Sequence, residues 1–303
     1  MQNNKYTADL ILLLVAAVWG FSLVAQSMGL EYLGPFGFNA GRFLLGALVL
    51  IPVCLFWHKA SIPNWPAMLK GSIAAGFILF MGASLQQAGL QYTTAGNAGF
   101  ITSMYIVFVP VFGLVLAQKT GINTWLGAGL AVTGLYLLSI GENFSINPGD
   151  ALVLAGAAFW AGHVLLIAKL ARQLNNLMLS LLQFIFCGLL CTVLAISFES
   201  ANFSTGNLLA AWQPLLFAGV LTVGIGHTLQ VVGQRSAPAS HAAIIMSLEA
   251  VFAALGGWLW LNEHLDTRQF TGCALMLAGV LLSQLPLSRR TKVTTDKTAP
   301  ENA

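Results

Sequence analysis

The chain has 303 residues, of which 57% are hydrophobic and only 8% are charged, and its formal net charge is +3. Soluble domains are about one quarter charged, so this composition excludes an ordinary soluble enzyme, a disordered chain and a nucleic-acid-binding protein. Cys54, Cys187, Cys191 and Cys273 all lie inside apolar runs, and their spacing is typical neither of a disulfide framework nor of a metal site. We expect no metal and no cofactor.

The chain is a succession of long apolar runs. A helix needs about 20 mostly apolar residues to cross a bilayer core, and ten runs close to that length are separated by short segments with turn residues. In chain order they cover roughly 10–29, 36–57, 67–90, 96–117, 123–141, 150–168, 177–198, 209–233, 239–261 and 268–286. The sequence predicts an all-α integral membrane protein with ten transmembrane helices, of which the first is retained and not a cleaved signal peptide.

Basic residues are distributed unevenly between the two sets of loops. If the N-terminus is cytoplasmic, the loops and tails on that side carry eleven Lys or Arg residues, whereas the opposite side carries only Arg268. Short cytoplasmic loops are enriched in Lys and Arg. We therefore expect both termini in the cytoplasm, with a polar cytoplasmic tail at 287–303.

The two halves of the chain resemble each other at an offset of about 141–144 residues. Corresponding residues include Trp19 and Trp160, Gln86 and Gln230, and Tyr105 and Glu249. Because each half has an odd number of predicted helices, the halves must cross the membrane in opposite senses. The chain is thus predicted to form two inverted five-helix repeats, at 8–141 and 150–286, an organisation typical of secondary transporters with a site between the halves.

Four segments carry a resemblance to a known family. They are Trp19-Gly20, Arg42-Phe43, LQQAGLQYTTAGNAGFI from Leu85 to Ile101, and SLEAVFAALGGWLWLNE from Ser247 to Glu263. These segments resemble the EamA-type transporters of the drug/metabolite transporter superfamily, and the resemblance extends over about residues 8–286 as two EamA-like units. It implies a multi-pass protein of the cell inner membrane that carries small metabolites, often as an exporter.

Two charged residues lie more than one helical turn inside the predicted helices, and at the bilayer centre a charge costs about 2.5–3.5 kcal/mol on insertion scales. Glu249 stands near the middle of the ninth run, and Arg42 stands in the first turns of the second run. Glu249 is a candidate protonation site or contact for a substrate amine, and Arg42 is a candidate clamp for a substrate carboxylate. The alternative is a permanent structural role, in which the two residues pair with each other or with the backbone.

Further polar and aromatic residues are candidates for the same pathway. His163 and His227 can relay protons, because imidazoles titrate near neutral pH, or they can be satisfied core residues. Gln86, Gln230 and Asn97, together with Tyr105, can line a cavity or form hydrogen bonds between helices. Trp19 and Trp160 can form the walls of a pocket or pack in the core.

Three residues mark positions where a helix can bend. Pro110 and Gly113 lie deep in the fourth run, and Gly257 lies at the corresponding place in the ninth run. Proline removes one backbone hydrogen bond and bends a helix. These positions predict either a gate that bends during transport or a fixed kink.

Together these features predict a secondary-active transporter and not an enzyme. No GxxxxGK[ST] motif is present, so the expected energy source is a proton gradient or the gradient of the substrate itself. The expected substrate is a small metabolite such as an amino acid, exported by alternating access through a site near Glu249, Arg42, Tyr105 and Trp160. The expected partners are this substrate and the lipid bilayer. A proton remains an open partner, and the protein is expected to be a monomer or a homodimer.

Two other functions stay open at this point. Efflux of hydrophobic cations would use Glu249 as the counter-charge and the aromatic residues as walls. An intramembrane enzyme is a remote alternative, because the sequence contains neither HExxH nor GxSxG.

Overall fold

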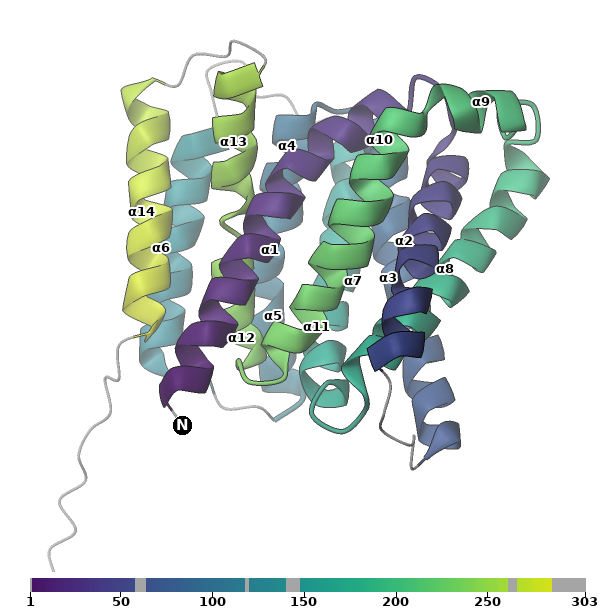
Figure 1. Ribbon diagram of the computed structural model, residues 1–303. Helices are drawn as coiled ribbons and strands as arrows, with labels where there is room; N and C mark the ends of the chain where they lie inside the picture. Colours follow the sequence, from purple (N-terminus) through teal and green to yellow (C-terminus); the bar gives the residue numbers. More distant parts are fainter. Residues whose placement is uncertain (1, 58–63, 118–119, 140–147, 261–265, 285–303) are drawn as a thin grey trace, which may run out of the picture.

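The computed structural model describes residues 2–57, 64–117, 120–139, 148–260 and 266–284. These residues form a bundle of helices without strands (Figure 1). The first half contains α1 (Gln2–Gly29), α2 (Pro35–Trp57), α3 (Trp65–Leu90), α4 (Ala95–Ser103), α5 (Tyr105–Val115) and α6 (Ile122–Ser139). The second half contains α7 (Pro148–Leu170), α8 (Asn176–Phe198), α9 (Thr205–Ala210), α10 (Trp212–Leu216), η1 (Phe217–His227), α11 (Thr228–Gln234), α12 (Ala239–Met246), α13 (Glu249–Trp260) and α14 (Thr267–Gln284).

Eight helical segments of the described chain are long and apolar enough to cross a membrane. They are Tyr6–Gly29, Pro35–Phe56, Trp65–Leu90, Ala95–Val115, Pro148–Leu170, Asn176–Phe198, Trp212–Gln234 and Ala239–Gly256. A ninth apolar helix, Ile122–Leu137, is shorter, and α14 is the remaining long helix. The all-α, multi-pass architecture is confirmed, whereas the count of ten spans stays a prediction. The predicted polar tail at 287–303 lies outside the described residues.

The fourth and ninth predicted runs are each interrupted near their middle. The first interruption is at Met104, between α4 and α5, and the second is at Ser247 and Leu248, between α12 and α13. At both places a backbone N–H reaches back only three residues, from Met104 to Ile101 and from Leu248 to Ile245. Such a tightened turn within a helix often marks a functional hinge.

The interruption of the fourth run is not at Pro110 or Gly113, the residues that the sequence analysis identified as possible bends. Helix α5 continues through Pro110, which is buried, and through Gly113. Gly257 lies within α13. Whether these residues bend during transport stays a prediction, but the breaks in the helices are at Met104 and Leu248.

The eighth predicted run contains a local change of helix type. Residues Phe217–His227 form a π-helix, η1, between the α-helical turns of α10 and α11. Helix η1 packs against α2 through Gly219, where an added Cβ would lie 2.7 Å from the Leu45 side chain. π-helical segments occur mostly as short insertions and frequently at functional sites. This segment therefore becomes a candidate for the site described below.

Helices α6 and α14 lie side by side at one edge of the bundle (Figure 1). They approach closely because glycines face each other: an added Cβ on Gly127 would lie 2.6 Å from the carbonyl oxygen of Gly279, and the reverse distance is also 2.6 Å. Small residues allow such close contact of helices in membranes. Elsewhere α2 packs against α8, α3 against α7, and α1 against both η1 and α13.

Candidate functional site

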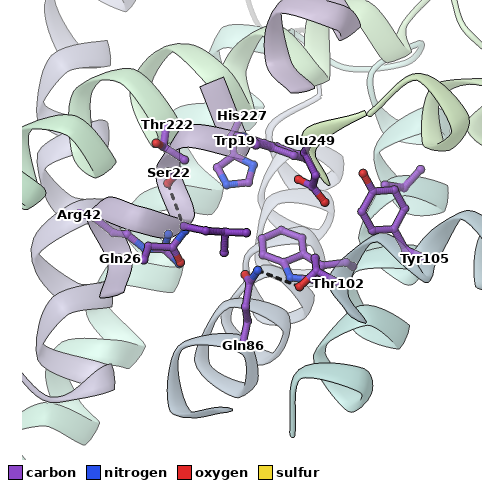
Figure 2. Close-up of a pocket in the computed structure, with 13 residues that line it drawn as sticks. Trp19, Ser22, Gln26, Arg42, Gln86, Thr102, Tyr105, Thr222, His227 and Glu249 are labelled. Atoms are coloured by element: carbon purple, nitrogen blue, oxygen red, sulfur yellow. Dashed lines mark hydrogen bonds between the residues drawn. The ribbon is translucent and has the colours of Figure 1, made fainter. Parts of the chain in front are cut away.

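A buried cavity lies in the interior of the bundle, where helices from both halves meet (Figure 2). Its lining residues are Trp19, Ser22, Leu23, Gln26, Arg42, Gln86, Thr102, Tyr105, Trp160, Val164, Thr222, His227 and Glu249. They come from α1, α2, α3, α4, α5, α7, η1 and α13. The free volume of about 30 Å³ has room for only about two water molecules. The cavity is therefore narrow in this conformation.

The interruptions of the fourth and ninth runs place two lining residues. Tyr105 is the first residue of α5 and Glu249 is the first residue of α13, directly after the breaks. The Ser103 hydroxyl donates a hydrogen bond of 3.4 Å to Glu249 Oε1, so α4 of the first half contacts α13 of the second. The side chain of Glu249 is 5% exposed and lies in the cavity wall. The broken helices thus bring a buried carboxylate of one half against polar groups of the other.

Arg42 is the second buried charge of the cavity. Its Nε donates to Asn39 Oδ1 at 2.8 Å, and its guanidinium carbon lies 4.9 Å from the centroid of the Phe43 ring. Among the described residues no carboxylate oxygen lies within 4.0 Å of the guanidinium. Figure 2 shows Arg42 and Glu249 at different sides of the group of lining residues. The permanent Arg42–Glu249 pair, which was one sequence-based alternative, does not occur in this structure.

Three rings form an aromatic cluster that we call the ring cluster: Trp19, Trp160 and His227. The His227 ring stacks on Trp160 with centroids 5.6 Å apart and planes at 10°, and Trp19 lies 4.7 Å from His227. The two indoles, at corresponding positions of the predicted repeats, are 6.2 Å apart. This cluster gives the cavity an aromatic wall.

Several polar atoms of the lining residues have no hydrogen-bond partner within the described chain. They are the indole N–H groups of Trp19 and Trp160, Nη2 of Arg42 and Oε1 of Gln26, whereas the hydroxyl of Tyr105 faces Glu249. Buried polar groups are costly unless they are paired. Because three of these four groups are donors, the cavity is suited to a ligand that carries acceptor oxygens.

Some predicted site residues do not line the cavity. His163 lies behind Trp160 and is fully buried, and its Nε2 lies 2.9 Å from Gln183 Oε1. The Gln230 side chain forms hydrogen bonds with the side chains of Gln234 and His227. Asn97 lies in the first turn of α4. These three residues support the site from outside or lie away from it. Gln86 lines the cavity and donates to Thr102 Oγ1 at 3.0 Å.

Sequence reasoning missed Ser22, Gln26, Thr102 and Thr222. Two of these residues carried a readable signal, because Trp19, Ser22 and Gln26 recur at helical spacing and so share one face of α1. Ser22 Oγ accepts from Gln26 Nε2 at 3.1 Å on that face. Thr222 carried no such signal, because it reaches the cavity from the π-helix, whose spacing differs from the α-helical pattern.

A bundle of long apolar helices around a buried polar cavity defines the protein as a multi-pass membrane protein with an internal polar site. The model of the EamA-like transporter family matches residues 6–140 and 147–285. The chain therefore belongs to the EamA-like transporter family, as its sequence predicted, and it is a membrane transporter.

Curated relatives carry transporter names. An "uncharacterized transporter" of Archaeoglobus fulgidus is 33% identical over 283 residues, which cover 93% of this chain and 87% of the relative. The "uncharacterized transporter YoaV" of Bacillus subtilis is 23% identical, with coverage of 91% and 96%. The "uncharacterized inner membrane transporter YedA" of Escherichia coli K12 is 26% identical over 150 residues, 48% of this chain and 47% of the relative.

The fold also matches a solved crystal structure. The two chains superpose with a TM-score of 0.76 at 18% identity, and the match covers 92% of this chain and 97% of the other. At this identity the similarity shows the fold alone.

Proposed function

We propose that the protein is a secondary-active exporter of small metabolites that carry both an amine and a carboxylate, such as amino acids. One observation carries the proposal: a buried basic group, Arg42, and a buried acidic group, Glu249, line a single cavity without pairing with each other. Arg42 would bind the substrate carboxylate through its planar fork. Glu249 would bind the amine, or a proton in its place.

The donor groups of the cavity support this assignment. A carboxylate presents about four lone-pair sites, and the indole N–H groups of Trp19 and Trp160 and Nη2 of Arg42 are donors that lack a partner within the described chain. The side chain of the substrate would lie against the ring cluster. The cavity thereby offers one contact surface for each part of an amino acid.

Helix packing supports two inverted repeats. If the halves are exchanged, the contact of α1 with α13 corresponds to that of α7 with α5, and the contact of α3 with α8 corresponds to that of η1 with α2. The contacts of α2 with α8 and of α6 with α14 each correspond to themselves. Such exchange symmetry favours alternating access, because each half can adopt the conformation of the other.

The narrow cavity supports an alternating mechanism. A free volume of about 30 Å³ is too small for an amino acid, so substrate binding must move the walls. The breaks at Met104 and Leu248 adjoin Tyr105 and Glu249, and they are the positions where a small change of backbone angle would widen the cavity. We propose that these breaks act as hinges.

For orientation, we propose that the protein lies in the cell inner membrane with both termini in the cytoplasm. The bias of Lys and Arg toward the loops on one side supports this orientation. The printed name of the E. coli relative, an inner membrane transporter, supports the location.

Transport by reconstituted protein tests the proposal. Purified wild-type protein in proteoliposomes is expected to move amino acids down an imposed gradient, and Glu249→Gln is expected to lose most of this transport and its response to pH. Glu31→Gln, at an exposed position of the turn after α1, is the matched control and should behave as wild type. Wild-type rates and pH response in Glu249→Gln would show that Glu249 carries neither a proton nor the substrate amine.

Efflux of hydrophobic cations is a second candidate, and the ring cluster beside Glu249 favours it. A substitution of Arg42 distinguishes the two candidate functions, because a buried guanidinium repels a cation and attracts a carboxylate. Arg42→Gln is expected to abolish amino-acid transport, whereas it should preserve or increase efflux of a cationic dye if the second function is correct. Resistance of expressing cells to toxic dyes and to toxic amino-acid analogues provides the comparison.

A further inference from the structure

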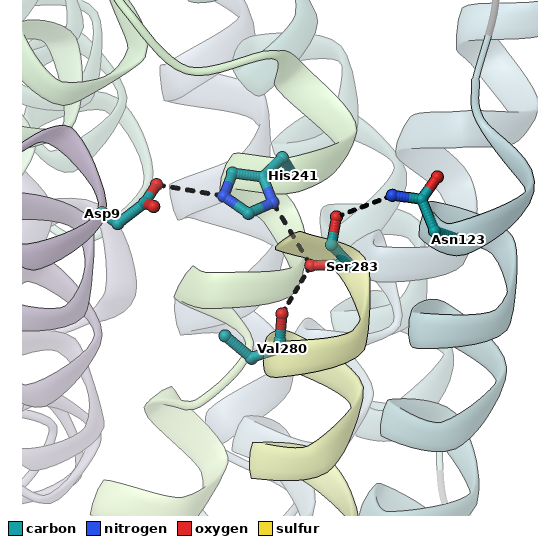
Figure 3. Close-up of polar contacts among 5 residues, drawn as sticks. All are labelled: Asp9, Asn123, His241, Val280 and Ser283. Carbon is teal, nitrogen blue, oxygen red and sulfur yellow. Dashed lines mark hydrogen bonds and ion pairs between the residues drawn. The ribbon is translucent and has the colours of Figure 1, made fainter. Parts of the chain in front are cut away.

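A second polar network, which we call the α12-end contact, lies away from the cavity. Asp9 of α1 contacts His241 of α12, with Oδ1 3.0 Å from Nε2, and His241 Nδ1 lies 3.2 Å from the hydroxyl of Ser283 on α14 (Figure 3). Asn123 of α6 donates to the backbone carbonyl of the same serine at 3.1 Å. Asp9, His241 and Ser283 are 9%, 6% and 6% exposed, so a titratable pair is buried at this place.

A similar polar contact, which we call the α4-end contact, involves another buried aspartate. The hydroxyl of Thr93, just before α4, donates to Asp150 Oδ1 at 2.6 Å. Asp150 is in the first turn of α7 and is 4% exposed. Like the α12-end contact, this contact joins the first half of the chain to the second.

The two aspartates correspond in the predicted repeat. Asp9 and Asp150 are 141 residues apart, which is the offset between Trp19 and Trp160. Each aspartate lies ten residues before the cavity tryptophan of its own helix, or about 15 Å along the helix axis. Each aspartate contacts the start of the fourth predicted run of the other half. Asp9 contacts His241, which is in the first turn of α12, and Asp150 contacts Thr93, which closely precedes α4.

The two contacts are at opposite ends of the bundle. Figure 1 shows α12 near the end that holds the N-terminus and α4 near the opposite end. The cavity, with Trp19 and Trp160 in its wall, lies between them. A path from the cavity to one face can run between α1 and α12, and a path to the other face can run between α7 and the start of α4.

We propose that the α12-end contact and the α4-end contact are the two gates of the transporter, each of which breaks when the cavity opens toward its own face. This inference rests on the proposed alternating access, but it assigns the gating to residues that do not line the cavity. Buried polar groups are expensive in a membrane and are retained there for function. In this structure both contacts are formed, so both proposed gates are closed, which agrees with the narrow cavity.

Access to the cavity from each face tests the gates directly. The probe is a membrane-impermeant maleimide, and its target is Thr222→Cys in the cavity wall of a full-length parent whose native residues Cys54, Cys187, Cys191 and Cys273 are replaced by alanine. Labelling rates are measured in sealed vesicles of both orientations. Protease cleavage of an N-terminal tag identifies the face on which the N-terminus lies.

Removing each contact should bias access in opposite directions. Asp9→Leu is expected to raise the labelling rate about tenfold from the N-terminal face, and Thr93→Val to raise it about tenfold from the other face, since each loses a hydrogen bond to a charged group. Thr93→Ser, which keeps the hydroxyl, should return the parent's rates. The exchange of Asp9→His with His241→Asp restores the pair but not the contact with Ser283, so it should return the rates of Ser283→Ala.

A milder variant covers the case in which Asp9→Leu fails to fold. Ser283→Ala keeps the Asp9–His241 pair, removes only the hydroxyl at Nδ1, and should give a smaller rise from the N-terminal face. The gates are refuted if folded variants of both contacts increase labelling from the same face or from neither. Failure of the proposed function looks different: the parent itself would then transport no amino acid, or its cavity would be labelled from neither face.

Discussion

The contact of α1 with α13 beside the cavity allows a prediction of stability. An added Cβ on Gly20 would lie 2.5 Å from the carbonyl oxygen of Glu249, 2.7 Å from Cβ of Phe252 and 2.8 Å from the backbone N of Ala253. Ordinary contacts of a Cβ atom begin at 3.4 Å, so Gly20→Ala must separate the two helices by about 0.9 Å. The obstructing atoms belong mainly to backbone, which cannot turn aside as a flexible side chain can.

We expect Gly20→Ala to destabilise the protein by about 1–3 kcal/mol, the usual cost of overpacking. The matched control is Gly129→Ala in α6, where an added Cβ meets nothing within 4 Å and should stabilise the helix by about 0.5–1 kcal/mol. Thermal unfolding of both variants in the same detergent gives the comparison. If Gly20→Ala unfolds at or above the temperature of Gly129→Ala, the close approach of α1 and α13 does not exist.

Two other contacts between the halves give predictions for the same unfolding assay. Glu199 accepts hydrogen bonds from the backbone N–H groups of Phe36 at 3.0 Å and Gly37 at 2.8 Å, so Glu199→Ala should cost about 1–3 kcal/mol. Glu199→Gln keeps an acceptor and should cost less; an equal loss would show that the charge at the start of α2 is irrelevant. Gly279→Ala should cost about 1–3 kcal/mol, because its Cβ would lie 2.6 Å from the Gly127 carbonyl. An unchanged unfolding temperature would contradict the direct contact of α6 with α14.

The sequence predicts the helices well because a bilayer constrains both their length and their composition. Predicted and observed boundaries agree closely for α2, where 36–57 becomes Pro35–Trp57, and for α8, where 177–198 becomes Asn176–Phe198. Prolines and asparagines mark these starts, as at Asn175, whose side chain accepts from the Met178 N–H. The residues next to such a helix start are therefore sufficient to predict where the helix begins.

The positions of the helix breaks could not be predicted from the sequence in the same way. The sequence drew attention to Pro110, because proline is the usual cause of a kink. The observed interruption at Ser247 and Leu248 has another local cause: the Ser247 hydroxyl donates to the Ile244 carbonyl at 2.8 Å and so competes with the backbone. A serine within an apolar run is common, and only its tertiary surroundings decide whether the helix breaks there.

Composition of the cavity was predicted better than its geometry. Arg42, Tyr105 and Glu249 stood out because polar residues within apolar runs need a reason, and all three line the cavity. His163 stood out for the same reason but lies behind Trp160, bonded to Gln183. Rarity in an apolar run identifies a polar residue as important, but only the direction of its helix face decides whether it reaches the ligand or supports a residue that does.

The predicted repeat explains why a symmetric scaffold can hold an asymmetric ligand. At an offset of 144 residues Tyr105 corresponds to Glu249, and at 141 residues Arg42 corresponds to Gln183. Arg42, Tyr105 and Glu249 line the cavity, whereas Gln183 is committed to a hydrogen bond with His163. If exchange symmetry fixes where the side chains stand, the differences between paired positions fix what binds. Under the proposed function, substrate choice depends on the paired positions that differ, and substitutions that make the two members of a pair identical should remove specificity before they remove the fold.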